Sequence, residues 1–169
     1  LEVPEVLQKF AIHAETGEAM PAELLSRMLG AATFDMGFQT VEYVASALVD
    51  LAFHEGGPPA DPMVRQAEIL AEIGMPVAIG MRHATPHFAH VFAGDGYSSA
   101  YYSYMWSEVM DADAFASFEE ATGAFDAERA KALQDHILSK GGSEDAEALY
   151  LALRGRMPDA TALLRNRGL

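Results

Sequence analysis

The chain has 169 residues, half of them hydrophobic, and a net charge of −14. This length and composition are typical of one folded domain with a buried core, and they exclude an intrinsically disordered chain. The excess of acidic side chains argues against nucleic acid or a membrane surface as a partner, because both need clustered Lys and Arg. The absence of cysteine excludes disulfides and thiolate metal sites, and with no visible secretory signal it fits a cytoplasmic protein.

Apolar residues recur at helical spacing along most of the chain. Asp61 followed by Pro62 is a typical helix start, and so is Ser143 with two acidic residues behind it. Glycine and proline end the segments, most clearly over residues 56–59. The pattern predicts helices over residues 4–13, 21–30, 35–54, 62–74, 97–121, 126–139, 143–153 and 159–166.

Residues 75–96 differ in composition from the rest. They include two prolines and three glycines among closely spaced histidine and aromatic side chains, so we expect irregular backbone there. The predicted fold class is therefore all-α, mainly helical, with one irregular loop segment near 75–96. No repeat or linker marks an internal boundary, and we expect residues 1–169 to form a single subdomain.

One histidine pattern resembles the start of a zinc-peptidase motif. In HExxH, two histidines one helical turn apart bind zinc and the glutamate acts as a base. His54 and Glu55 begin this pattern, but Pro58 stands where the second histidine is needed. Because proline offers no ligand, we interpret His54 and Glu55 as the C-terminal end of a helix.

A second histidine pattern consists of His83, His87 and His90. Spacings of four and three residues could bring three imidazoles to one metal if the segment were helical. Pro86 lies inside the pattern, and the residue before a proline avoids helical geometry. A metal site at these histidines therefore stays an open alternative.

Three tyrosines follow this segment at helical spacing. On a helix, Tyr97, Tyr101 and Tyr104 would lie within a stripe about 60° wide. A phenol keeps its proton at neutral pH, so three parallel phenols could donate hydrogen bonds to an oxyanion. The turn at Gly94 and Gly96 before them would let a substrate backbone approach closely. The alternative is that the stripe is a packing surface.

The stretch from His90 to Trp106 resembles the segment that follows the zinc site in the thimet oligopeptidase, oligopeptidase A and peptidyl-dipeptidase Dcp family. The shared pattern is a histidine, a short loop ending in glycine, a tyrosine, small residues, two tyrosines, a small residue, a tyrosine, an aliphatic residue and a tryptophan. Further similar segments lie at residues 15–21, 107–115, 141–145, 155–158, 162–164 and 167–169. The resemblance therefore covers essentially the whole chain.

The resemblance implies a mostly helical zinc metallopeptidase that hydrolyses short peptides in a channel. It implies that His90, Tyr97 and Tyr104 stabilise the oxyanion and hold the substrate backbone, with Tyr101 as a supporting substrate contact. From the turn itself we expect Gly94 and Gly96 to contact the substrate as well. The resemblance also implies that zinc is held in a full-length parent by an HExxH segment that this chain lacks, so no metal is expected here. The first residue is Leu1 rather than Met, and we expect a C-terminal fragment that is inactive alone and pairs with the missing N-terminal part of the same polypeptide.

Three further expectations complete the sequence reading. Asp95 separates the two glycines of the loop, and its carboxylate either points to solvent or binds a cationic substrate group. We expect Trp106 to be buried. The alternatives to a peptidase fragment are a noncatalytic peptide-binding module, a stand-alone metalloprotein that uses the three histidines, and a stable fragment with no function of its own.

Overall fold

The computed structural model describes residues 3–169, which fold as two compact units. Unit 1 consists of residues 3–34 and 108–169, and unit 2 of residues 35–107. The chain passes from one unit to the other after residue 34 and again after residue 107, and the sequence shows no change in composition at either place. The expectation that residues 1–169 form a single subdomain stays a prediction.

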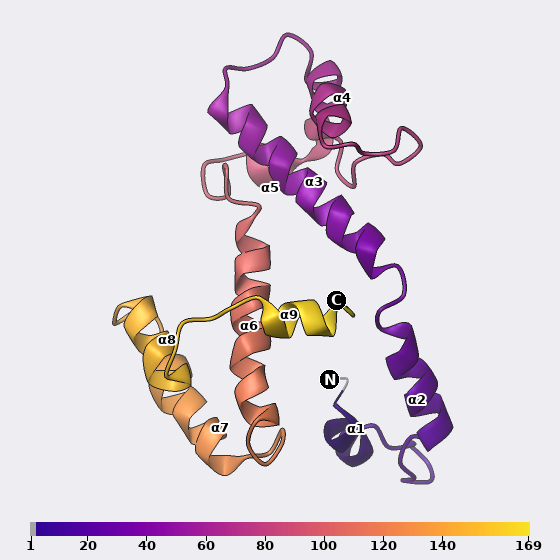
Figure 1. Cartoon of the computed structure of the whole chain (residues 1–169), viewed down its shortest axis with the longest axis vertical. Coiled ribbons are helices and arrows are strands. Elements are labelled where there is room, and N and C mark those ends of the chain that lie inside the picture. The colour runs from indigo at the N-terminus through magenta and orange to yellow at the C-terminus, as the bar shows by residue number, and fades with distance from the viewer. Residues whose placement is uncertain (1–2) are drawn as a thin grey trace. The chain divides into compact units, whose positions relative to one another are not determined.

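Helices dominate both units (Figure 1). Within residues 3–169 no named strand occurs, and one isolated antiparallel bridge joins Ile12 and Ala19. The predicted all-α class is therefore confirmed. The elements are α1 Pro4–Phe10, α2 Ala22–Ala31, α3 Met36–Glu55, α4 Pro62–Glu72, the 3-10 turn η1 Thr85–His87, α5 Ala89–Phe92, α6 Ser103–Glu119, α7 Ala127–Leu133, the π-helical turn η2 Gln134–Leu138, α8 Ala146–Arg154 and α9 Thr161–Asn166.

Three helix boundaries differ most from the sequence prediction, and the helix predicted over 126–139 is divided into α7 and η2. Helix α1 ends at Phe10 rather than near residue 13, because the chain turns to form the bridge from Ile12. Helix α6 begins at Ser103 rather than at residue 97, because Ser99 has a left-handed backbone with φ of 59°. The cap of α8 is Asp145, whose carboxylate accepts from the Ala148 N–H at 3.1 Å, instead of Ser143.

Unit 2 has its core between α3, α4 and the segment that follows them. Helix α3 packs against α4, and α4 packs against η1. The side chain of Asp61 caps α4 as predicted, accepting from the N–H groups of Met63 and Val64. Eight buried residues form the core: Ala45, Val49, Ile69, Leu70, Met75, Met81, Phe88 and Val91. The irregular segment predicted near 75–96 thus contributes half of this core, and its only helical pieces are η1 and α5.

Unit 1 contains a buried carboxylate, Asp113 on α6, whose side chain is 1% exposed. Tyr150 donates to one of its oxygens at 2.8 Å, and Arg154 donates to the same oxygen at 3.2 Å. Arg156 donates to the other oxygen. Arg154 also pairs with both oxygens of Glu120, at 2.6 and 2.7 Å. This network ties α6 to α8 and to the turn after it.

Apolar packing in unit 1 supports the same elements. Ala112 and Ala116 of α6 pack against Ala162 of α9. Helix α8 packs against η2, which continues α7 (Figure 1). The helices of residues 3–169 include none that is both long and apolar enough to span a bilayer.

Candidate active site

Four rings of unit 2 gather at one place on its surface. His90 comes from α5, Tyr97 and Tyr101 come from the loop before α6, and Tyr104 lies in the first turn of α6. The His90 ring stacks on Tyr97 with 4.3 Å between centroids, and it lies 5.9 Å from Tyr104. The Tyr97 and Tyr104 rings are parallel to within 5° at 6.3 Å. We call these four residues the phenol cluster.

Hydrogen bonding in the phenol cluster centres on Tyr104. His90 Nε2 lies 2.7 Å from the Tyr104 hydroxyl. Desolvation raises the pKa of Tyr104 above its ordinary value of 10.0, and the charge and hydrogen bond of Tyr97 raise it further. Tyr104 therefore keeps its proton at neutral pH and can act as a hydrogen-bond donor.

Exposure separates the rings that can meet a ligand from the ring that supports them. Tyr97 is 46% exposed and Tyr104 is 40% exposed, whereas Tyr101 is half-buried and packs against the core of unit 2. The edge of Tyr101 contacts Phe88 at 4.9 Å between centroids, and Tyr101 also meets Tyr104 edge to face. Tyr101 thus connects the exposed rings to the core.

The structure brings the sequence-predicted tyrosines together by a different route from the predicted one. The helical stripe is wrong, because Tyr97 and Tyr101 precede α6 and the left-handed Ser99 lies between them. The three tyrosines converge because the loop packs against α5 through the His90 ring and against α3 through hydrogen bonds to Asp50. That path depends on tertiary contacts, which the spacing of the residues does not contain.

The glycine loop is open to solvent. A Cβ built at Gly94 or Gly96 meets no protein atom within 4 Å, and Asp95 between them is exposed. The hydroxyl of Ser98 donates to the Gly94 carbonyl at 2.9 Å, which closes the loop in front of Tyr97. The substrate-contact role of Gly94 and Gly96 stays a prediction.

The prediction for Trp106 is wrong. Its side chain is 61% exposed, although it lies one turn of α6 from residues that pack inward. Large apolar character indicated burial, but residue 106 falls on the outer face of the helix. Met110 and Phe115, farther along α6, are also more than one-third exposed.

Two residues of α3 that sequence reasoning passed over support the phenol cluster. The carboxylate of Asp50 is fully buried and accepts from the N–H of Ser99 at 3.2 Å and of Tyr101 at 2.9 Å. The hydroxyl of Tyr43 donates to the Tyr101 carbonyl at 2.5 Å and accepts from the Met105 N–H at 3.1 Å. The signal for Asp50 was available, because an acidic residue lies between Val49 and Leu51 on an apolar stretch.

The interpretation of His54 and Glu55 as the C-terminal end of a helix is confirmed. Helix α3 ends at Glu55, and His54 Nδ1 lies 2.8 Å from the Asp50 carbonyl and 2.9 Å from the Asp50 carboxylate. The imidazole also stacks on Phe92 at 5.4 Å. His54 therefore has the contacts of a structural residue at a helix end.

The three spaced histidines do not share a site. His83 stacks on the core residue Phe88, while His90 belongs to the phenol cluster. Across residues 3–169 no group of three or more His, Asp or Glu side chains is arranged to hold a metal ion. The donor set of the described chain therefore does not fit a zinc site.

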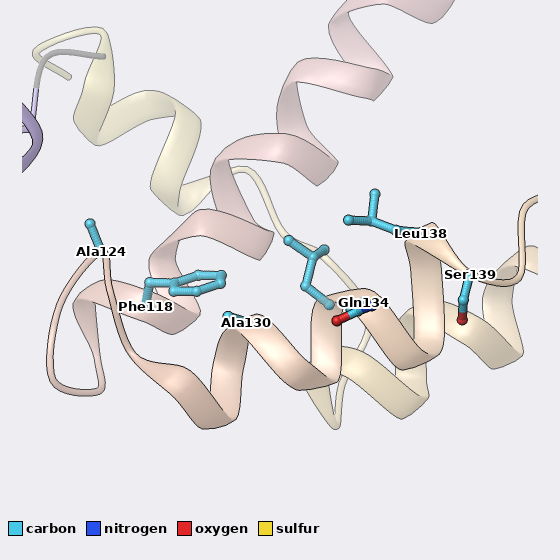
Figure 2. Close-up of a pocket in the computed structure, with 7 residues that line it drawn as sticks. Phe118, Ala124, Ala130, Gln134, Leu138 and Ser139 are labelled. Atoms are coloured by element: carbon cyan, nitrogen blue, oxygen red, sulfur yellow. The ribbon is translucent and has the colours of Figure 1, made fainter. Parts of the chain in front are cut away.

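A separate pocket lies in unit 1, between the end of α6, α7 and η2 (Figure 2). Its volume is about 570 Å³, and its lining is mainly apolar, with Gln134 and Ser139 as its polar residues. It contains none of the four rings of the phenol cluster and no ionisable side chain. The pocket and the phenol cluster are thus separate features.

The fold and the phenol cluster define a helical protein with phenol and imidazole side chains gathered at one exposed place on unit 2. The family model for peptidase family M3 matches residues 1–169, and the chain belongs to that family. The resemblance stated from His90 to Trp106 is confirmed.

Curated relatives agree with this assignment. The chain is 40% identical to Oligopeptidase A of Escherichia coli over 98% of its own length. It is 34% identical to Dipeptidyl carboxypeptidase of the same organism and 34% identical to the Organellar oligopeptidase A of Arabidopsis thaliana, again over 98% of the chain. In each case it spans only 22–25% of the relative's length.

Proposed function

We propose that this chain supplies substrate-binding and oxyanion-stabilising residues to a zinc-dependent peptidase that hydrolyses short peptides, and that it is inactive alone. The observation that carries the proposal is the 2.7 Å contact between His90 and a Tyr104 hydroxyl whose pKa is raised. The chain spans about a quarter of the relatives named oligopeptidase and dipeptidyl carboxypeptidase, so the rest of the machinery belongs to the remainder of such a polypeptide.

Tyr104 is the donor to the oxyanion. When a nucleophile attacks a peptide carbonyl, negative charge grows on its oxygen, and a fixed O–H aimed at that oxygen lowers the barrier. A donor must hold its proton throughout, and the raised pKa of Tyr104 meets that requirement. Its 40% exposure leaves the hydroxyl accessible to a substrate.

His90 and Tyr97 orient this donor. A phenol has one proton, so Tyr104 can give it to an oxyanion only if its other contacts become donors to the phenol oxygen. His90 does so in the tautomer that carries hydrogen on Nε2. The Tyr97 ring lies parallel to Tyr104 at 6.3 Å between centroids, which restricts the orientation of the Tyr104 ring, and we propose that Tyr97 also contacts the substrate backbone.

Zinc, when bound in the parent, would supply an activated water and a polarised carbonyl. The residues that the structure describes do not fit a zinc site, so no step is assigned to the metal here. The proposed partners are short peptides and the remaining part of the polypeptide, and the proposed location is the cytoplasm.

The test compares Tyr104→Phe with Tyr102→Phe in the polypeptide that contains this chain. Loss of one oxyanion donor costs about 10²–10³ in turnover, whereas Tyr102 is 45% exposed and lies outside the phenol cluster. We expect kcat to fall at least tenfold for Tyr104→Phe with bound zinc unchanged, and to stay within twofold for Tyr102→Phe. Equal rates for the two variants would remove Tyr104 from the oxyanion role.

The isolated chain is tested separately with fluorogenic peptides and added zinc. We expect no hydrolysis. Hydrolysis by this chain would overturn the proposed inactivity, and tight peptide binding without hydrolysis would favour the noncatalytic binding module instead.

A further inference from the structure

The loop that carries the phenol cluster is tied to a single helix. Asp50 uses both carboxylate oxygens, one for the Ser99 N–H at 3.2 Å and one for the Tyr101 N–H at 2.9 Å. The side chain of Asp50 has no exposed surface. A buried carboxylate is stabilised only by the groups that donate to it, so its position and that of the loop backbone depend on each other.

The second tie is Tyr43. Its hydroxyl donates to the Tyr101 carbonyl at 2.5 Å and accepts from the Met105 N–H at 3.1 Å, and its ring stacks on Tyr101 at 5.3 Å. Met105 is the third residue of α6. Tyr43 therefore bridges the end of the loop and the first turn of the helix that carries Tyr104.

The two ties act from one face of α3. Residues 43 and 50 are seven positions apart, which brings their side chains to within about 20° of the same direction on a helix. Between them they hold the backbone at Ser99, Tyr101 and Met105. This is the stretch that fixes where Tyr101 and Tyr104 point.

The contacts of His54 strengthen the first tie. Its Nδ1 lies 2.9 Å from the Asp50 oxygen that also accepts from Ser99, and its ring stacks on Phe92 of α5. The helix that carries His90 is thereby joined to the same carboxylate. Asp50 therefore contacts the loop before Tyr104 directly, and it contacts the helix of His90 through His54 and Phe92.

We propose that Asp50 and Tyr43 are the positioning residues of the phenol cluster, which hold its loop so that His90 and Tyr104 meet. Neither residue touches the substrate in this assignment. Its catalytic consequence rests on the proposed function, whereas the positioning itself is a property of this chain and is measured on it directly.

The experiment uses Asp50→Asn and Tyr43→Phe, with Asp111→Asn and Tyr102→Phe as matched controls on exposed residues. Asparagine replaces one accepting oxygen of Asp50 by a donor, so one loop N–H loses its partner. On the isolated chain we expect amide exchange at Ser99 or Tyr101 to rise at least tenfold in Asp50→Asn. Exchange at Met105, whose N–H also donates to the Tyr102 carbonyl at 3.2 Å, should rise at least threefold in Tyr43→Phe. The nuclear Overhauser contact between the His90 and Tyr104 rings should weaken in both variants.

The controls should leave these signals unchanged, and helical circular dichroism checks that each variant is folded. If Asp50→Asn does not fold, Tyr43→Phe decides the question, because it removes one oxygen from a half-buried ring. Unchanged exchange and an unchanged ring contact in a folded variant would overturn the proposal.

The second measurement is the kcat and KM of both variants in the polypeptide that contains this chain. We expect both variants to lower kcat at least tenfold with KM changed less than threefold, because the donor is misplaced rather than removed. Unchanged kcat, in a polypeptide where Tyr104→Phe does lower it, would overturn the catalytic part of the proposal. Failure of Tyr104→Phe itself would instead overturn the proposed function and leave the exchange measurement to decide the positioning.

Discussion

Each unit of the chain buries one carboxylate almost completely, and the two are held in opposite ways. Asp113 in unit 1 receives hydrogen bonds from two guanidinium groups and a phenol. Asp50 in unit 2 receives them from two backbone N–H groups and lies beside one imidazole. The first arrangement neutralises a charge and joins helices, while the second fixes the path of a loop.

The different donors give the two carboxylates different roles: Asp113 stabilises the packing of helices, and Asp50 positions a loop. Removing one partner of a buried ion pair leaves other charges uncompensated, so its effect appears in stability. Removing an acceptor of loop N–H groups releases a segment that water can then solvate, so its effect appears in local geometry. Burial alone does not distinguish the two, whereas the identity of the donors does.

The largest stability effect is expected for Asp113→Ala. The change leaves Arg154, which is 7% exposed, without its buried partner, and loss of one member of a buried pair costs about 3–5 kcal/mol. Urea unfolding followed by circular dichroism measures the change in free energy. A loss below about 1 kcal/mol would place Asp113 with ordinary surface ion pairs.

Lowering the pH is expected to reduce the free energy of unfolding less than Asp113→Ala does, because protonation removes the charge of Asp113 but keeps its side chain. Burial alone would raise the pKa of Asp113, but hydrogen bonds from Tyr150, Arg156 and Arg154 outweigh it and hold the pKa below 3.8. A carboxylate with a lowered pKa stabilises the fold above the pKa of the unfolded chain, and that stability is lost as the pH falls through the folded value.

The free energy of unfolding should therefore fall as the pH drops below about 5 and keep falling until Asp113 is protonated, and it should fall less steeply in Asp113→Asn than in the unchanged chain. Urea titrations at several pH values measure both slopes. Identical slopes would show that other carboxylates carry the acid sensitivity.

Helix caps give a matched pair across the two units. Asp61 caps α4 in unit 2, and Asp145 caps α8 in unit 1. Replacing either by Ala removes an acceptor for N–H groups of the first turn and should cost about 1 kcal/mol. Asp61 accepts from two N–H groups and Asp145 from one, so we expect Asp61→Ala to cost at least as much as Asp145→Ala. A clearly larger loss for Asp145→Ala in urea unfolding would contradict this.

The smallest effect is expected for Trp106→Ala. The ring is 61% exposed, and substitutions of exposed residues usually change stability by about 0.5 kcal/mol or less. The same urea measurement checks this value. A loss of several kcal/mol would show that the outer face of α6 is covered in solution.

Local signals predicted most of the fold. Proline and aspartate marked the start of α4, and glycine with proline marked the end of α3, because these residues act within one turn of the backbone. The start of α6 was predicted six residues early, since nothing in the local sequence shows that Ser99 turns left-handed. That turn depends on Asp50, about 50 residues away in the chain.

For the candidate site, residue types were predictable and geometry was not. His90, Tyr97, Tyr101 and Tyr104 were identified, and they do converge, but through a loop rather than a helical stripe. Tyr43 was missed because it looks like an ordinary residue of an amphipathic helix, whereas Asp50 was missed although its position between Val49 and Leu51 was a signal. Only the long-range hydrogen bonds show what they hold.

The left-handed Ser99 also bears on which conformations compete during folding. The stretch from Tyr97 to Tyr102 has the spacing of a helix and directly precedes α6, so its local preference is to extend that helix backwards. A left-handed residue other than glycine costs about 1–2 kcal/mol, and two hydrogen bonds to Asp50 flank it. The hydrogen bonds to the Asp50 carboxylate thus stabilise the loop relative to an α6 extended over residues 97–102. The tyrosines meet His90 in the loop conformation.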